Sequence, residues 1–236
     1  MAKKPLTGAL PAYLQVSEAL IRDIAAGRYR DGDRLPPERE MASGLGIAVG
    51  TLRKALAELE ERGLLERRQG SGNYIRQRQA PEAIYAFFRL ELLSGGGLPT
   101  ARALSVDRLT KPAHLPPFGS HPQAHRIRRL RRLSGQPASI EEIWLDAAHA
   151  EDLRPDDLSE SLYLFYREAL GLWITGYEDR VGTAPVPDWS PPDFAPRPGT
   201  PCAMVERLSR SRDGQVVEVS QNWFDSDIAR YVARIG

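Results

Sequence analysis

Apolar side chains recur at helical spacing in three segments near the start of the chain, and glycine-containing turns separate the segments. The first segment covers residues 11–26, the second begins near Pro37, and the third covers about residues 49–62. Two short strand-like stretches then flank Gly70-Ser71-Gly72. Helix, helix, turn, helix and hairpin in this order predict a winged helix-turn-helix, which lays its last helix in the DNA major groove and its hairpin beside it.

The remaining two-thirds of the chain has the shorter period that is typical of β-strands. Residues 157–170 instead repeat apolar side chains helically and predict a helix. Ser134-Gly135-Gln136-Pro137 has the composition of a hairpin turn between two strands. The predicted strands are residues 101–110, 124–133, 138–145, 173–183, 202–212 and 215–224, while residues 83–93 and 227–235 fit either a strand or a short helix. This order predicts an α+β domain with a mostly antiparallel sheet and flanking helices.

Composition changes between these two regions and predicts a boundary. We expect a winged helix-turn-helix domain at residues 1–76, a polar linker at 77–83 and a second domain at 84–236. Residues 1–80 hold 14 Lys and Arg against 10 Asp and Glu, while the rest of the chain holds 18 against 21. The basic excess therefore lies on the part that is predicted to bind DNA.

The chemistry-bearing residues argue against an enzyme or a metalloprotein. The single cysteine, Cys202, excludes a disulfide within the chain and a cysteine cluster for zinc or iron–sulfur. We interpret the four histidines as surface or loop residues, since their spacing suits no metal: His114, His121, His125 and His149. No motif for a nucleophile, phosphate loop or metalloprotease is present. We expect no catalytic residue, metal or cofactor. No signal peptide or membrane-spanning run is evident, so we expect a cytoplasmic protein.

The N-terminal region resembles the DNA-binding domain of the GntR family of bacterial transcription regulators. The matching residues are Tyr13-Leu14-Gln15, Gly27-Arg28, Gly32-Asp33-Arg34-Leu35-Pro36, Glu38-Arg39-Glu40, Leu45-Gly46, Thr51-Leu52-Arg53, Ala55-Leu56, Leu59, Gly63-Leu64-Leu65 and Gln69-Gly70-Ser71-Gly72. The resemblance implies that the arginine of helix two binds a phosphate, that the start of helix three faces bases and backbone, and that the wing glycines approach the minor groove. The expected DNA-contacting residues are Arg39, Thr51, Arg53, Lys54, Gly70, Ser71 and Gly72. Alternatively, Arg39 and Arg53 lie on the solvent-exposed surface of their helices and contact no DNA.

Four positions depart from the family pattern. Pro37 and Ala48 stand where the family commonly has serine or threonine, so two side-chain helix caps are missing. Val49 replaces the arginine that most often reads guanine, and Gly50 replaces a frequent threonine. We therefore expect fewer direct base contacts than usual, and more reading of DNA shape.

The second domain is similar to UTRA, the ligand-sensing domain of the HutC subfamily of GntR regulators. The supporting residues are Arg129-Leu130-Arg131, Gly135-Gln136-Pro137, Glu141, Ser161-Leu162-Tyr163, Glu218-Val219-Ser220 and Asp227. The resemblance implies a chorismate-lyase-like fold and a pocket for a small polar metabolite, lined by Arg129, Arg131, Glu141, Ser161, Tyr163 and Phe224. Two arginines on one strand face would bind a carboxylate or phosphate. Alternatively, the two arginines form ion pairs with glutamates on the face of the sheet and bind no ligand. The subfamily's common Arg-x-Asp appears here with an acidic residue, Asp225, in place of the arginine.

Strand parity decides whether the three charged residues can meet. Arg129 and Arg131 share a face because they are two positions apart. Glu141 joins that face if the hairpin loop has an odd number of residues, or if a β-bulge intervenes. A strict two-residue turn without a bulge would place Glu141 on the other face.

Together these features predict a DNA-binding transcription regulator, most often a repressor in this family. It would act as a homodimer on a palindromic double-stranded operator, and a small effector bearing a carboxylate or phosphate would change its operator affinity. The alternatives are a constitutive DNA-binding protein without an effector and an enzyme related to chorismate lyase.

Overall fold

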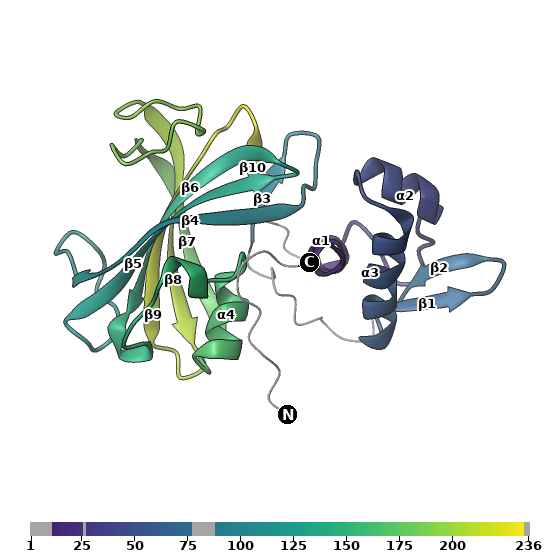
Figure 1. Cartoon of the computed structure of the whole chain (residues 1–236), viewed down its shortest axis with the longest axis horizontal. Coiled ribbons are helices and arrows are strands. Elements are labelled where there is room, and N and C mark those ends of the chain that lie inside the picture. The colour runs from purple at the N-terminus through teal and green to yellow at the C-terminus, as the bar shows by residue number, and fades with distance from the viewer. Residues whose placement is uncertain (1–10, 26, 77–87, 234–236) are drawn as a thin grey trace. The chain divides into compact units, whose positions relative to one another are not determined.

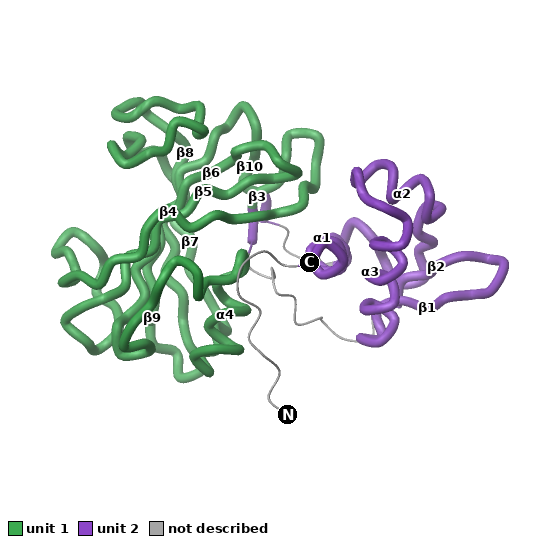
Figure 2. Tube along the Cα trace, viewed as in Figure 1, with its two compact units in different colours: residues 1–9, 90–231 green, residues 10–89, 232–236 purple. Residues whose placement is uncertain are grey.

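The computed structural model describes residues 11–25, 27–76 and 88–233 of the 236-residue chain. These residues form two compact units (Figure 2). The N-terminal unit contains the described residues up to Arg89 together with Val232 and Ala233, and the C-terminal unit is residues 90–231. The linker predicted at residues 77–83 lies outside the described residues.

The N-terminal unit is a winged helix-turn-helix (Figure 1). Its elements are α1 (Ala12–Ala25), α2 (Glu38–Gly44), α3 (Val49–Glu61), β1 (Leu65–Arg68) and β2 (Gly72–Ile75). The two strands pair antiparallel and form the wing. Apolar side chains at helical spacing in α1 and α3 face inward with the buried strand residues, and the core contains Ile21, Ile24, Leu52, Leu56, Leu59, Leu65 and Ile75.

The two helices of the helix-turn-helix begin without side-chain caps. Pro37 precedes α2 and Ala48 precedes α3, and neither side chain accepts a hydrogen bond from the first turn. The missing caps that the sequence predicts are therefore observed, and packing of the apolar face must hold each helix start.

The C-terminal unit is built around a six-stranded antiparallel sheet, which confirms the α+β prediction (Figure 1). The strands lie in the order β4-β5-β6-β9-β8-β7. Their bounds are β4 (Pro99–Thr110), β5 (Gln123–Leu133), β6 (Gln136–Asp146), β7 (Ile174–Pro185), β8 (Pro201–Ser211) and β9 (Val216–Phe224). A separate two-stranded ribbon pairs β3 (Leu90–Leu92) with β10 (Ala229–Tyr231).

The two faces of this sheet are covered differently. The helix α4 (Leu162–Ala169) packs on one face, where Phe165 and Tyr166 join a core with Ile127 and Ile143 of the sheet. We call this the α4 face. The opposite face is covered by loop residues from segments 111–122 and 186–200, including Phe118.

Two predictions are wrong in detail. The helix expected at residues 157–170 begins only at Leu162, because Ser161 caps it by accepting a hydrogen bond from the Leu164 N–H. A separate 3-10 helix (Pro155–Asp157) precedes it. His125, expected on the surface, is buried on β5, where its Nε2 lies 2.8 Å from the Ala150 carbonyl oxygen.

Candidate functional site

The N-terminal unit presents the predicted DNA-contacting cations on the surfaces of α2 and α3. Arg39, Arg53 and Lys54 are exposed, and Thr51 is half-buried. The side chains of Arg39 and Lys54 make no hydrogen bond or ion pair within the described residues. Their charges are therefore available to a phosphate backbone.

Arg53 is held in place by a carboxylate. Its Nε donates to Glu38 Oε2 at 2.7 Å, and this hydrogen bond is the main reason that the pKa of Glu38 lies below its usual range. The backbone carbonyl of Arg53 also accepts from Arg67 Nη2 at 3.0 Å. The sequence did not predict this contact with Glu38, which orients the guanidinium of Arg53.

Two glycines with positive φ shape the tip of the wing. Gly70 has φ +72° and Gly72 has φ +119°, values that favour glycine over other residues. Ser71 Oγ lies 2.8 Å from the Tyr74 hydroxyl, so its side chain is oriented by the wing itself. A Cβ on Gly70 would meet nothing within 4 Å, so the backbone there is open, which suits close approach to a nucleic acid.

The hairpin β5–β6 brings Glu141 to the same face as the two arginines. Its turn has only two residues, Ser134 and Gly135, with φ +46° and +82°. A β-bulge then shifts the register, because Arg131 pairs with Ser139 while Arg132 pairs with Pro137. Glu141 consequently lies directly opposite Arg129.

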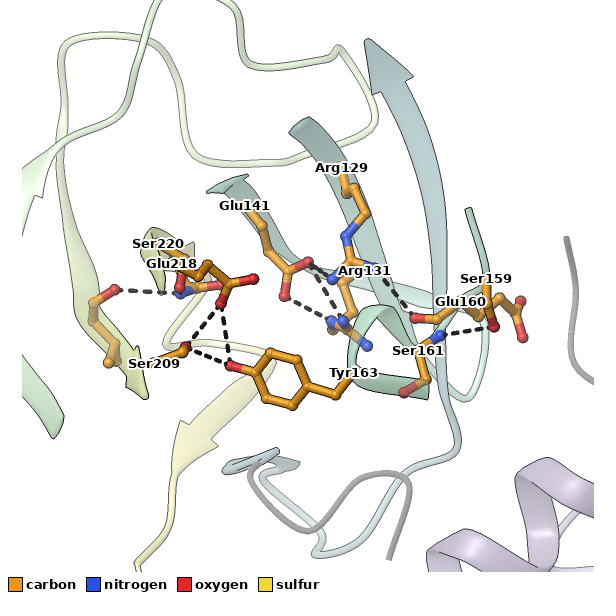
Figure 3. Close-up of polar contacts among 12 residues, drawn as sticks. Arg129, Arg131, Glu141, Ser159, Glu160, Ser161, Tyr163, Ser209, Glu218 and Ser220 are labelled. Carbon is orange, nitrogen blue, oxygen red and sulfur yellow. Dashed lines mark hydrogen bonds and ion pairs between the residues drawn. The ribbon is translucent and has the colours of Figure 1, made fainter. Parts of the chain in front are cut away.

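These three side chains form a buried ion triad on the α4 face (Figure 3). Glu141 Oε2 lies 2.6 Å from Arg129 Nη2, and Glu141 Oε1 accepts from Arg131 Nε at 2.8 Å. Burial alone would raise the pKa of Glu141, but the two guanidinium charges outweigh it and lower that pKa to about 2. The triad carries a net positive charge, since two arginines share one carboxylate.

The N-terminal end of α4 lies beside the triad. Arg129 Nη1 donates to the Glu160 carbonyl at 3.2 Å, next to the capping Ser161 (Figure 3). Phe224 of β9 is opposite Ser139 in the register, so it shares the face of Arg131. Ser161 and Phe224 therefore lie on the α4 face with the arginines, and their contact with a ligand stays a prediction.

A second polar group on the same face centres on Glu218 of β9. Its carboxylate accepts from Ser209 Oγ at 2.8 Å and from Tyr163 Oη at 3.2 Å (Figure 3). It also accepts from Tyr166 Oη at 2.7 Å. Burial raises the pKa of Glu218 against the lowering effect of these donors. The pKa of Tyr163 is also raised, first by burial and then by the Glu218 charge.

Tyr163 was expected in the pocket from the sequence, whereas Glu218 and Ser209 were not. The signal was the carboxylate itself, since Glu218 interrupts a strand whose neighbours Val217 and Val219 are apolar. A charged residue at an inward position of a strand marks a polar site.

Two buried polar atoms in this region lack a partner. Ser139 Oγ, on a residue with 0% exposure, and Arg129 Nε make no hydrogen bond within the described residues. Buried polar groups are nearly always satisfied, and each exception calls for an explanation such as a ligand or an ordered water. The α4 face therefore has unused hydrogen-bonding capacity next to a positive charge.

The acidic residue Asp225, which follows β9, uses its carboxylate within its own turn. Its Oδ1 accepts the Asp227 N–H at 2.9 Å, and its own N–H donates to the Ala138 carbonyl. The carboxylate thus caps the turn after β9.

A hollow of about 650 Å³ lies elsewhere in the unit, lined among others by Asp146, His149, Trp173 and Arg212. The buried Asp146 there is already satisfied by Lys111 and by the Ser120 N–H. The α4 face, with its unsatisfied atoms, is the better candidate for a ligand site.

Neither a metal centre nor a membrane span emerges from the part of the chain that the structure describes. No group of three or more His, Cys, Asp or Glu side chains there is arranged to hold a metal ion. None of the helices within the described ranges has the length and apolar character to cross a bilayer.

The fold and these surfaces define a class: a winged-helix DNA-binding unit joined to a sheet unit with a buried polar site. Comparison with known proteins gives the family. Residues 12–75 match the model of the bacterial regulatory proteins of the gntR family, and residues 95–230 match that of the UTRA domain. The chain belongs to the GntR family of transcriptional regulators, in the HutC subfamily that carries a UTRA domain. It is a DNA-binding regulator rather than an enzyme.

Relatives and a solved structure agree with this membership. The chain is 59% identical to the HTH-type transcriptional regulator SmoD of Agrobacterium fabrum, over 97% of each chain. It is 26% identical to the mannosyl-D-glycerate transport/metabolism system repressor MngR of Escherichia coli, over 93% of this chain and 94% of MngR. The crystal structure of YydK from Bacillus subtilis, described as a possible transcriptional regulator, aligns with a TM-score of 0.52 at 18% identity, covering 96% of this chain and 100% of YydK, and shows the shared fold.

Proposed function

We propose that this chain is a homodimeric repressor whose affinity for a palindromic operator changes when a small polar effector binds the α4 face. Residues 1–76 bind DNA through Arg39, Thr51, Arg53, Lys54, Gly70, Ser71 and Gly72. Residues 84–236 bind the effector and dimerise. The protein acts in the cytoplasm, where a bacterial chromosome lies.

The observation that carries the effector site is the buried triad together with its unsatisfied neighbours. Arg129 and Arg131 share the carboxylate of Glu141, so the three side chains together carry a net positive charge. The unpartnered Arg129 Nε and Ser139 Oγ lie on the same face. A carboxylate or phosphate satisfies both the charge and the donors.

Glu218, Ser209 and Tyr163 give the other end of the site a different character. A buried carboxylate surrounded by hydroxyls suits the hydroxyl groups of a carbohydrate or polyol. The relative MngR is named for a mannosyl-D-glycerate system, and that compound combines sugar hydroxyls with a carboxylate. We therefore assign the effector to the class of polyhydroxylated anions.

Thermal unfolding of the full chain in the presence of carboxylated, phosphorylated and neutral sugars tests this assignment. A ligand that binds only the native state raises the melting temperature. We expect anionic sugars to raise it and to change operator affinity, while neutral sugars have little effect. If no compound altered operator affinity, a constitutive DNA-binding protein would be the better description.

Ser139→Ala is the sharpest variant, because its hydroxyl has no partner in the described structure. Removing an unsatisfied buried hydroxyl leaves stability unchanged or raises it by about 1 kcal/mol. We expect effector affinity to fall about tenfold, the value of one lost hydrogen bond. Ser190→Ala is the matched control, since Ser190 Oγ is also buried and unpartnered but belongs to the segment that covers the opposite face. Equal effector affinity in the two variants would remove Ser139 from the site.

A further inference from the structure

The wing of the DNA-binding unit contains a third extended segment. Residues 32–35 run beside β2, with the Leu35 N–H donating to Asn73 O and the Ile75 N–H donating to Asp33 O, each at 2.9 Å. Arg34 forms an isolated antiparallel β-bridge with Tyr74. Leu35 is buried and Arg34 is exposed, so alternation turns the Arg34 side chain to the outer face of the wing.

The guanidinium of Arg34 lies next to Gly72. A Cβ built on Gly72 would be 3.1 Å from Arg34 Nε and 3.5 Å from Nη2. By contrast, a Cβ on Gly70 would meet nothing within 4 Å. Gly72 thus differs from Gly70 in a specific way: the space above it is taken by an arginine side chain from another segment.

Arg34 also differs from the other arginines of the wing in its charge environment. Arg67 pairs with Glu60, and Arg68 and Arg76 both pair with Glu66. The Arg34 side chain makes no hydrogen bond or ion pair with any residue that the structure describes. Its planar set of N–H donors remains available for an anion.

We propose that Arg34 binds a DNA phosphate beside the wing, and that Gly72 is a glycine so that Arg34 can lie across the wing toward its tip. The family resemblance gave Gly72 the role of letting backbone approach DNA. In this proposal, the lack of a side chain at Gly72 leaves room for the Arg34 guanidinium. A guanidinium can bind a phosphate with two parallel hydrogen bonds. Arg34 thereby adds a DNA contact in a protein that lacks the arginine and threonine common in the family at positions 49 and 50.

The test uses the full chain and a labelled duplex selected by the wild-type protein from a random library. Binding is followed by fluorescence anisotropy between about 50 and 200 mM KCl. We expect Arg34→Ala to weaken binding about tenfold and to reduce the slope of log K against log salt by about 0.9, the signature of one lost phosphate contact. Arg34→Lys should keep most of the slope. Arg197→Ala, which removes an equally exposed positive charge from the C-terminal unit, should change neither quantity.

The dependence on Gly72 is tested by a double-mutant cycle. Gly72→Ala places a methyl group 3.1 Å from Arg34 Nε, so the guanidinium must shift, and Gly72→Ala and Arg34→Ala should be non-additive in binding. Additive losses would overturn the role given to Gly72. A salt slope for Arg34→Ala equal to that of Arg197→Ala would overturn the phosphate contact, as would a changed base preference in duplexes reselected with Arg34→Ala. Arg34→Ala alters only an exposed side chain, so it tests the contact even if Gly72→Ala does not fold.

Discussion

Two arginine–glutamate pairs of nearly equal length lie in very different surroundings. Arg53 Nε is 2.7 Å from Glu38 in the N-terminal unit, and Arg131 Nε is 2.8 Å from Glu141 in the C-terminal unit. The side chains of Arg53 and Glu38 are 64% and 24% exposed, whereas those of Arg131 and Glu141 are 5% and 8% exposed. Water screens the first pair, so Arg53 can exchange its carboxylate for a DNA phosphate at small cost. The second pair is isolated from water, and breaking it leaves a buried charge.

The largest expected effect comes from removing the shared carboxylate of the buried triad. Glu141→Gln removes the carboxylate that both buried arginines contact, and we expect the free energy of unfolding to fall by about 3–5 kcal/mol. Tryptophan fluorescence during urea unfolding measures this change selectively. All four tryptophans, Trp144, Trp173, Trp189 and Trp223, belong to the C-terminal unit.

Glu38→Gln is the matched control for this comparison. It removes the carboxylate from a pair of the same length that is exposed, and we expect a loss below about 1 kcal/mol by circular dichroism. Equal losses in the two variants would show that burial does not separate the pairs.

Acidification should reveal the same contrast through the pKa of Glu141. This pKa falls from 4.5 to about 2 on folding. The contribution of Glu141 to the free energy of unfolding is therefore complete above pH 4.5 and is lost as pH falls toward 2. The shift corresponds to about 3 kcal/mol. Glu218 acts oppositely, because its raised pKa means that protonation on acidification adds stability. The difference between wild type and Glu141→Gln cancels this second effect, and a difference independent of pH between 4.5 and 2 would contradict the assignment.

The two units also differ in the side chains that precede their helices, and the expected effects on stability are smaller. Ser161 caps α4 in the C-terminal unit, whereas Ala48 leaves α3 of the N-terminal unit uncapped. We expect Ser161→Ala to cost about 1 kcal/mol and Ala48→Ser to add a similar amount, each in its own unit. Circular dichroism at 222 nm follows the N-terminal helices and tryptophan fluorescence the other unit. A destabilising Ala48→Ser would show that the first turn of α3 cannot accept a cap.

The sequence predicted the architecture well because each element carried a local signal. Periodicity located α1, α3 and most sheet strands, and the Ser134-Gly135 turn located the central hairpin. The error at residues 157–170 arose because periodic apolar side chains continue on both sides of a serine cap. His125 was misplaced because a single buried hydrogen bond to a carbonyl leaves no trace in spacing.

The polar site was only partly predictable, since its members depend on register. Arg129, Arg131 and Glu141 could be proposed to meet, but the bulge that brings them together has no signature in the sequence. Ser209 and Glu218 face each other across the β8–β9 hairpin, but Tyr163 reaches them only because α4 packs on the folded sheet. Ion pairs such as Arg53–Glu38 likewise join helices whose separation along the chain gives no clue to their contact.

The bulge at Ala138 gives the hairpin a tolerance to changes in length. The turn needs two residues and the triad needs Arg129 opposite Glu141, and one unpaired residue reconciles the two requirements. Losing Ala138 would leave the pairs on either side of it intact, because Pro137 would then be followed directly by Ser139. Deletion of Ala138 would thus remove the acceptor of the Asp225 N–H but keep Arg129 opposite Glu141. Relatives whose hairpins differ by one residue can retain the same ligand chemistry, and an alignment that treats such a gap as a loss of register would compare opposite faces of the sheet.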